Sequence, residues 1–418
     1  MARCEIIREN DFINISGDFL YSDLFFLLAN IHKAVEDRGF SDLTLNFKGC
    51  TSAYAQEMVV LCAQIIAKRQ NGIYIHLNLP EDEQLQKLFQ NANWANLIDP
   101  RRYEAAPNTF YSAGHIPATQ YTSSNEQFTI VNKIVDNILG AIPDMKREDF
   151  SAFEWAINEI TDNVLTHAQS SVGGVVALSL SSKKKKVNYV VADAGLGIAT
   201  TLRSGEHKGI SDVHGLQMAI REGVTRDRSI GQGNGLFGSY EISQACNGVF
   251  RIRSGHADLY LSSKRELKIT SEKILYNGTM VAGEIDFSIP GLLADALKFG
   301  GQKSEVTYDF IDAKYSPNEE GKVLFVLRNE AVSFGSRPAG TPIRNKLRTL
   351  CDTHDCKKIL VDLEGIPILS SSFADEAFGK LFKEIGPLEF MSKIEFINVM
   401  GTCKNLINKA IAQRMGTG

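Results

Sequence analysis

Apolar and polar positions alternate with two different periods along the first hundred residues. Runs that alternate residue by residue predict strands, whereas apolar residues spaced three and four apart predict helices. The strand-like runs are 12–16, 43–47 and 73–77, and the helix-like runs are 22–35, 55–68 and 82–93. Strands that alternate with helices over short connections are typical of α/β layers. The pattern therefore predicts an α/β domain over residues 1–100.

The end of the chain repeats this pattern. Residues 43–49 match residues 359–365, and after a turn of slightly different length residues 52–58 match residues 371–377. Two copies of one supersecondary unit therefore flank the middle of the chain. Further strand-like runs at 322–327 and 393–399 and a last helix at 405–414 complete the later copy. We expect a second α/β domain over residues 300–418, with the first copy more diverged.

The junction between strand and helix in the later copy reads Ser-Ser-Ser-Phe-Ala-Asp-Glu-Ala-Phe-Gly over residues 370–379. This segment resembles the STAS-like domain, which is related to the anti-sigma-factor antagonists and is often attached to ATPase domains. In antagonists of that class a partner kinase phosphorylates a serine at this junction, a place similar to that of Ser52, Ser371 and Ser372 here. The alternative is that these serines cap helix N-termini, because a serine hydroxyl satisfies free backbone amides there.

A polar row runs along the helix predicted over residues 153–167. Its apolar stripe is formed by Phe153, Ile157, Ile160 and Val164. Beside that stripe, Glu159, Asn163 and His167 follow each other at intervals of four residues. A carboxylate can accept a proton from water and a carboxamide oxygen is a hard ligand for Mg²⁺. The row therefore suits a metal-nucleotide site; the alternative is an ordinary amphipathic helix with a solvated face.

Three glycine-containing segments follow this helix. The first, Asp193-Ala194-Gly195-Leu196-Gly197, comes directly after predicted strands at 174–180 and 187–191; an Asp there can accept a hydrogen bond from an exocyclic amine. The second, residues 231–238, opens a helix to Ala245, where free amides and the helix dipole favour a phosphate. The third places Gly278-Thr279 before a strand at 284–289. The order excludes a P-loop, and no Rossmann fingerprint follows the first strand.

The Glu-x-x-x-Asn helix, Asp-x-Gly-x-Gly, Gly-x-Gly-Leu-x-Gly and Gly-Thr stand in one order within residues 125–295. Together they resemble the GHKL (Bergerat) ATP-binding fold of gyrase, MutL, the heat-shock chaperones and histidine kinases. The resemblance implies ATP and Mg²⁺ as ligands, with Glu159 as the base that activates water, Asn163 as the Mg²⁺ ligand and Asp193 as the partner of the adenine amino group. The other nucleotide-binding residues that it implies are His167, Gly195, Gly197, Gly233, Gly235, Leu236, Gly238 and Thr279.

Residues 199–230 would then form a lid over the nucleotide. From its basic residues one or two could meet the γ-phosphate; they are Arg203, His207, Lys208, Arg221, Arg226 and Arg228. The predicted fold class is thus α/β, in the form of an α+β sandwich: a central GHKL domain at 125–295 between two STAS-like domains. Residues 101–124, which contain Pro107, Gly114 and Pro117, are expected to be a linker or a strap lying on the next domain.

Composition mainly serves to exclude some classes of protein. A net charge of −4 and a hydrophobic content of 44% over 418 residues indicate a folded protein without general affinity for nucleic acid or membrane surfaces. No signal peptide or membrane-spanning run is visible, and seven scattered cysteines suit a reducing compartment, so we expect a cytoplasmic protein. The four lysines at 183–186 are interpreted as the solvated tip of a hairpin, and Cys351 to Cys356 as a turn rather than a metal site.

Three functions remain open. The first is an ATP-dependent conformational and signalling switch with slow hydrolysis. The second is a serine kinase of the anti-sigma type that phosphorylates a STAS-like domain in its own chain or in a partner. Kinases of this class also carry a glutamate one turn before the Mg²⁺-binding asparagine, as Glu159 stands before Asn163 here. The third is an ATP-gated scaffold without turnover. All three imply an unidentified protein partner bound through the STAS-like domains, and homo-oligomer formation stays open.

Overall fold

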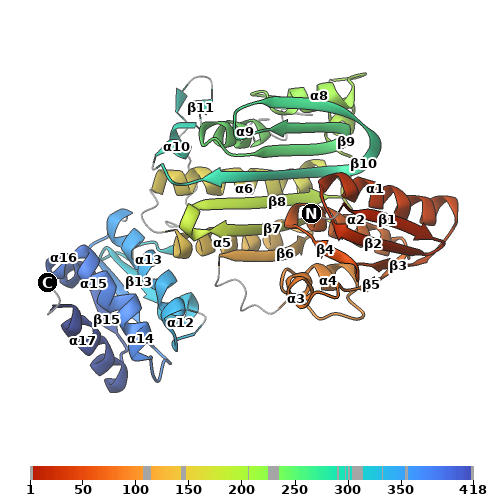
Figure 1. Ribbon diagram of the computed structural model, residues 1–418. Coiled ribbons are helices and arrows are strands. Elements are labelled where there is room, and N and C mark those ends of the chain that lie inside the picture. Colours follow the sequence, from red (N-terminus) through yellow and green to blue (C-terminus); the bar gives the residue numbers. More distant parts are fainter. Residues whose placement is uncertain are drawn as a thin grey trace. The chain divides into compact units, whose positions relative to one another are not determined.

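The computed structural model of the chain contains two compact units (Figure 1). The residues that the structure describes are 3–106, 114–142, 147–205, 207–224, 235–289, 291–296, 298–299, 302–303, 314–331, 333–353 and 356–415. Unit 1 comprises Met1–Phe110, His115–Val131 and Trp155–Ser304, and unit 2 comprises Tyr111–Gly114, Asn132–Glu154 and Glu305–Gly418. The α/β class predicted from the sequence is confirmed.

The first sheet of unit 1 is built by the amino-terminal residues. Its strands have the order β1-β2-β3-β5, with β4 beside β2; they are β1 (Glu5–Glu9), β2 (Phe12–Asp18), β3 (Asp42–Asn46), β4 (Cys50–Ser52) and β5 (Tyr74–Asn78). Strand β1 is antiparallel to β2, and the other pairs are parallel. The helices are α1 (Tyr21–His32), continued by the π-helical turn η1 (Lys33–Asp37), α2 (Ala55–Gln70), α3 (Glu83–Asn91) and α4 (Trp94–Ile98). The helix predicted at 82–93 ends early because Asn93 adopts a φ of 66°.

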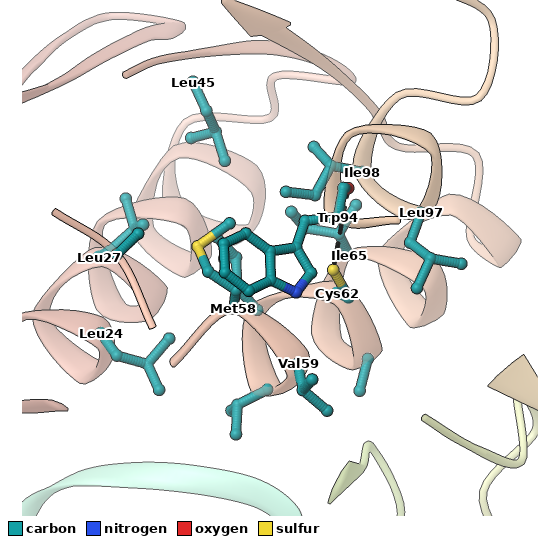
Figure 2. Close-up of a cluster of buried hydrophobic side chains, with 14 of the residues drawn as sticks. Leu24, Leu27, Leu45, Met58, Val59, Cys62, Ile65, Trp94, Leu97 and Ile98 are labelled. Carbon is teal, nitrogen blue, oxygen red and sulfur yellow. Dashed lines mark hydrogen bonds between the residues drawn. The ribbon is translucent and has the colours of Figure 1, made fainter. Parts of the chain in front are cut away.

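Helix α2 is buried on nearly all sides. Its residues from Met58 to Ala63 are all fully buried. Figure 2 shows Met58, Val59, Cys62 and Ile65 of α2 among side chains of α1, β3 and α4. The Cys62 thiol donates to the Trp94 carbonyl oxygen at 3.9 Å. A helix that is apolar all round lies between two layers rather than on one surface.

The second layer against α2 is the central sheet. Its antiparallel strands have the order β6-β7-β8-β10-β9; they are β6 (His115–Tyr121), β7 (Gly174–Ser181), β8 (Lys186–Asp193), β9 (Phe250–Leu261) and β10 (Leu267–Asp286). One face of this sheet shares a single buried core with α2; it contributes Val175, Ala177, Val190, Ala192, Met280 and Ala282. Strand β6 lies within the segment predicted as a linker, so part of that segment is an edge strand.

The other face of the central sheet carries helices. Tyr189 alternates with the core residues of β8 and is hydrogen-bonded to Ser243 of α9 (Gly235–Ala245). The Tyr121 hydroxyl donates to the Thr161 carbonyl oxygen of α6 (Arg147–His167) at 3.1 Å. The Gln127 side chain of α5 (Ser124–Ala141) donates to the Thr161 hydroxyl at 2.8 Å. The central sheet is therefore buried on both faces.

The sequence prediction for the last strand of the central sheet was wrong in its extent. Strand β10 begins at Leu267, so Gly278 and Thr279 lie inside it rather than before it. The apolar pattern is interrupted because the register between β9 and β10 shifts on either side of Tyr276.

Short elements complete unit 1: η3 (Ser182–Lys184), α7 (Ile198–Arg203), α8 (Asp212–Ala219), α10 (Leu292–Ala296), β11 (Lys298–Phe299) and β12 (Gln302–Lys303). The lysine run begins at the predicted hairpin tip, but Lys186 already belongs to β8 and forms an ion pair with Glu284 at 2.7 Å.

Unit 2 contains a parallel sheet of order β13-β14-β15, the same order as β2-β3-β5. Its strands are β13 (Lys322–Val326), β14 (Lys358–Asp362) and β15 (Ile394–Ile397). Its helices are α12 (Leu327–Glu330), α13 (Arg337–Thr353), α14 (Ser371–Ala374), the π-helical turn η4 (Asp375–Gly379), α15 (Lys380–Ile385), α16 (Pro387–Lys393) and α17 (Gly401–Met415). Helix α13 packs on the end of α5: Asn345 donates to the Gly140 carbonyl oxygen at 3.0 Å, and buried Lys346 contacts Asp136 at 2.7 Å.

Cys351 lies on the last turn of α13, so the turn predicted at 351–356 begins as helix; His354 and Asp355 lie outside the described residues. The Cys351 and Cys356 side chains are buried. In the part of the chain that the structure describes, no group of three or more His, Cys, Asp or Glu side chains could hold a metal ion. Within the same residues, no helix has both the length and the apolar character needed to span a bilayer.

The shared core predicts that the amino-terminal layer and the central sheet unfold together. We expect Met280→Ala in β10 to lower the free energy of unfolding by about 2–5 kcal/mol, because a fully buried side chain leaves a cavity. Urea unfolding is followed by Trp94 fluorescence in α4, in a Trp155→Phe background of the full chain. The control is Leu275→Ala on the same strand, where 51% of the side chain is exposed. A Trp94 transition unchanged by Met280→Ala would contradict the shared core.

Candidate functional site

The polar row predicted on α6 exists as a half-buried row. Burial raises the pKa of Glu159, and the nearby charge of Asp162 adds to that effect. A carboxyl group with a raised pKa is a better proton acceptor than a fully solvated one. His167 lies on the last turn of α6, where its carbonyl oxygen accepts a hydrogen bond from the Thr201 hydroxyl at 3.2 Å.

The amino-terminus of α9 lies directly against this row. A Cβ added at Gly235 would be 2.6 Å from Glu159 Oε2 and 3.3 Å from Asn163 Nδ2. Real Cβ contacts do not fall below 3.0 Å, so any larger residue at position 235 would force the Glu159 side chain to move. The first residue of an eleven-residue helix is thereby placed beside a carboxylate and a carboxamide. The positive end of that helix dipole faces the same place, a geometry that favours anions.

Asp193 ends β8 as a buried carboxyl group, 2% exposed. Its Oδ1 accepts the Gly195 amide at 2.8 Å, and the Thr279 amide also donates to this side chain. Burial raises the pKa of Asp193 to about 7, although both amides oppose the rise. A carboxyl group held by two amides in this environment suits a further hydrogen-bond donor from a ligand.

Glycines allow three backbone segments to meet beside Asp193. A Cβ at Gly195 would lie 2.1 Å from the Ala168 carbonyl oxygen, just beyond α6. Gly278 has a φ of 126°, and a Cβ there would lie 2.2 Å from the Asp193 carbonyl oxygen. A Cβ at Gly197, the residue before α7, would lie 2.7 Å from Ser254 Oγ. These positions require glycine because backbone or short side chains fill the space of a Cβ.

The structure thus brings most of the predicted site residues into two groups, one at the polar row of α6 and one around Asp193 beside Ala168, which directly follows α6. Glu159 and Asn163 meet Gly235, and Leu236 and Gly238 follow in the first turn of α9. Thr279 joins the group around Asp193, and its hydroxyl lies 3.4 Å from that of Ser254. Gly233 lies outside the described residues.

The basic residues of the predicted lid differ in their exposure and in their contacts. Arg203 is engaged within the fold, because it donates to the Asp212 carboxylate at 3.0 Å and to the Ile210 carbonyl oxygen at 2.9 Å. Lys208 and Arg221 are exposed and His207 is half-buried. Arg226 and Arg228 lie outside the described residues.

Three residues near Asp193 were not predicted from the sequence. Ser254 of β9 accepts the Ile198 amide and donates to the Gly278 carbonyl oxygen, both at 2.9 Å. The Tyr276 hydroxyl donates to the Asp193 carbonyl oxygen at 2.8 Å. Gln64 of α2 donates to the carbonyl oxygens of Asn277 and Asp193 at 2.7 and 3.5 Å. No motif marks these residues, and the one available signal was the continuous apolar run of α2.

The serines at the strand-to-helix junctions have different roles. Ser52 belongs to β4, and its hydroxyl donates to the Asp18 carboxylate at 2.9 Å, so it is not a helix cap. In unit 2 the cap is Ser370, whose hydroxyl accepts the Phe373 amide at 3.0 Å. Ser371 is exposed and Ser372 is half-buried. The capping interpretation therefore applies to the neighbouring serine rather than to the three that were predicted.

The raised pKa of Asp193 predicts a pH dependence of stability. Between the ordinary value of 3.8 and about 7, the unfolded chain loses this proton while the folded chain keeps it. The free energy of unfolding should therefore fall as the pH rises through this window, by up to about 1.4 kcal/mol per pH unit.

Asp193→Asn should remove that share of the slope in urea titrations between pH 4 and 8. Glu57, whose pKa burial also raises to about 7, should keep its own share. A slope identical in both proteins would show that Asp193 is not a buried carboxyl group.

Comparison with known families gives one match. Residues 339–402 match the family model described as the STAS-like domain of unknown function (DUF4325). The match runs from α13 to the first residues of α17 and confirms the STAS-like prediction for this part of the chain. No curated protein matches the chain. The STAS-like relationship of residues 1–100 and the GHKL resemblance of residues 125–295 stay predictions. The carboxy-terminal part of the chain is thus similar to a STAS-like domain, a class whose members often mediate protein interactions.

Proposed function

We propose that unit 1 binds Mg²⁺-ATP in the manner of a GHKL domain and acts as a nucleotide-dependent switch for the STAS-like part of the chain. The observation that carries this proposal is the close approach of Gly235 to both Glu159 and Asn163. It supports a site in which a helix amino-terminus, a carboxylate and a carboxamide share one small space. That combination suits a phosphate group with a divalent cation.

The residues present fit such a ligand. Asp193, with two amide partners and a raised pKa, would accept a hydrogen bond from the adenine amino group. Asn163 would offer its side-chain oxygen to Mg²⁺, and the first turn of α9 would face the phosphates. When bound, Mg²⁺ would neutralise part of the phosphate charge. Glu159 would orient a water molecule and accept its proton, a role favoured by its raised pKa.

The switch is proposed because helix α6 has residues in both units. Residues 155–167 of this helix belong to unit 1 and carry the candidate site, whereas its first residues belong to unit 2. A ligand that orders the unit 1 part of α6 therefore acts on a helix that continues into the unit with the STAS-like domain. Nucleotide state would bias that domain toward or away from a protein partner, with slow hydrolysis resetting it.

One incubation of the purified chain with γ-labelled ATP separates the candidate functions. We expect bound label that is released slowly as inorganic phosphate. Glu159→Gln should lower this release on the order of 100-fold or more while leaving binding intact, because a carboxamide cannot accept the proton. The matched control is Glu241→Gln on α9, which also removes a carboxylate with a raised pKa. Release by Glu159→Gln at the parental rate would refute the assigned base, and no bound label in the parent would refute the site.

A serine kinase is the second candidate function. It is favoured by the exposure of Ser371, which leaves its hydroxyl accessible while Ser370 caps the helix. In the same incubation this function would place label on protein, and mass mapping of Ser52, Ser371 and Ser372 would locate it. Bound label without phosphate release or protein labelling would instead indicate the ATP-gated scaffold.

A further inference from the structure

Helix α2 of the amino-terminal layer reaches the candidate adenine end of the site through Gln64. The Gln64 amide donates to the carbonyl oxygen of Asn277 at 2.7 Å and to that of Asp193 at 3.5 Å. Its side chain is also hydrogen-bonded to the Tyr276 hydroxyl. Tyr276, 1% exposed, in turn donates to the Asp193 carbonyl oxygen at 2.8 Å. One side chain of α2 thus contacts the end of β8 and the irregular stretch inside β10.

These contacts lie beside the two amides that hold the Asp193 carboxylate. The amide of Gly195 follows the Asp193 carbonyl by two residues, and the amide of Thr279 follows the Asn277 carbonyl by two residues. The ladder between β9 and β10 shifts register on both sides of Tyr276, so regular strand pairing does not fix this stretch. Side-chain hydrogen bonds to the carbonyls of this stretch therefore contribute more to its position than they would in a regular strand.

We infer that Gln64 is a positioning residue for Asp193, so that the amino-terminal layer contributes to the recognition of the adenine amino group. This inference rests on the proposed nucleotide function of the site. Gln64 touches no ligand itself. It holds the two backbone segments whose amides direct the Asp193 carboxylate. By linkage, a nucleotide that engages Asp193 would strengthen the packing of α2 on the sheet by the same factor.

A nucleotide pair that differs at the exocyclic group provides the test. ADP carries the 6-amino group, and inosine diphosphate carries an oxygen there. We expect Gln64→Ala in the full chain to weaken ADP binding while leaving the affinity for inosine diphosphate unchanged. The expected weakening is roughly 3- to 10-fold, as for the loss of one hydrogen bond. In an Asp193→Asn background Gln64→Ala should have no further effect on ADP, because both changes act on the same contact.

Gln70→Ala is the matched control. Gln70 is on the same helix and likewise donates to a backbone carbonyl of the central region, that of Ser171 at 3.1 Å, without contact to the Asp193 segments. It should leave the ratio of the two affinities at the parental value. Equal weakening of both nucleotides by Gln64→Ala, or an ADP affinity equal to that of Gln70→Ala, would overturn the positioning role.

Hydrogen exchange separates failure of this inference from failure of the proposed function. In the protein without nucleotide, Gln64→Ala should speed exchange of the Gly195 and Thr279 amides, and Gln70→Ala should not. If the parent binds neither nucleotide, the proposed function falls, while faster exchange at both amides still supports the structural link. Unchanged exchange in Gln64→Ala overturns the link whatever the nucleotide result.

Discussion

The burial of α2 between two sheets is the constraint on which the rest of unit 1 depends. This helix presents apolar residues on all sides, so one layer cannot satisfy it. The parallel sheet of the amino-terminal residues covers one side, and the central antiparallel sheet covers the other. The central sheet in turn is closed on its second face by α5, α6 and α9. What the sequence presents as two successive domains therefore shares one hydrophobic core.

That arrangement also determines the chemistry at the end of β8. Because both faces of the sheet are covered, the carboxyl group of Asp193 is removed from water and its pKa rises to about 7. Burial of a carboxyl group is unfavourable unless hydrogen-bond donors compensate for lost solvent. Here the donors come from the turn at Gly195 and from the irregular part of β10, and Gln64 holds both segments from the side of α2. A buried polar cluster is thus built from three separate parts of the chain.

Much of this fold could be predicted from the sequence, because local patterns determine local elements. The period of apolar residues predicted the three parallel strands of each α/β region and helices α1, α2, α3 and α17, but not β1, β4, α4 or α13. The row of Glu159, Asn163 and His167 was visible as a spacing on one helix. Two elements of the central sheet were missed or misplaced because they depend on tertiary pairing. Strand β10 contains a register shift that breaks its alternation, and β6 joins the sheet as an edge strand from a segment rich in turn residues. The contact of Gln64 with Asn277 joins residues 213 positions apart. No local pattern encodes such a contact.

We propose that a nucleotide binds where α6, the end of β8 and β10 meet, and that Gln64 of α2 positions the backbone around Asp193. Hydrogen exchange of the full chain with and without Mg²⁺-ADP tests all these elements in one measurement. Nucleotide binding there should slow exchange in residues 159–167, 193–198 and 276–280, and also in residues 60–66 of α2. Unchanged exchange in all four stretches at saturating nucleotide would contradict it.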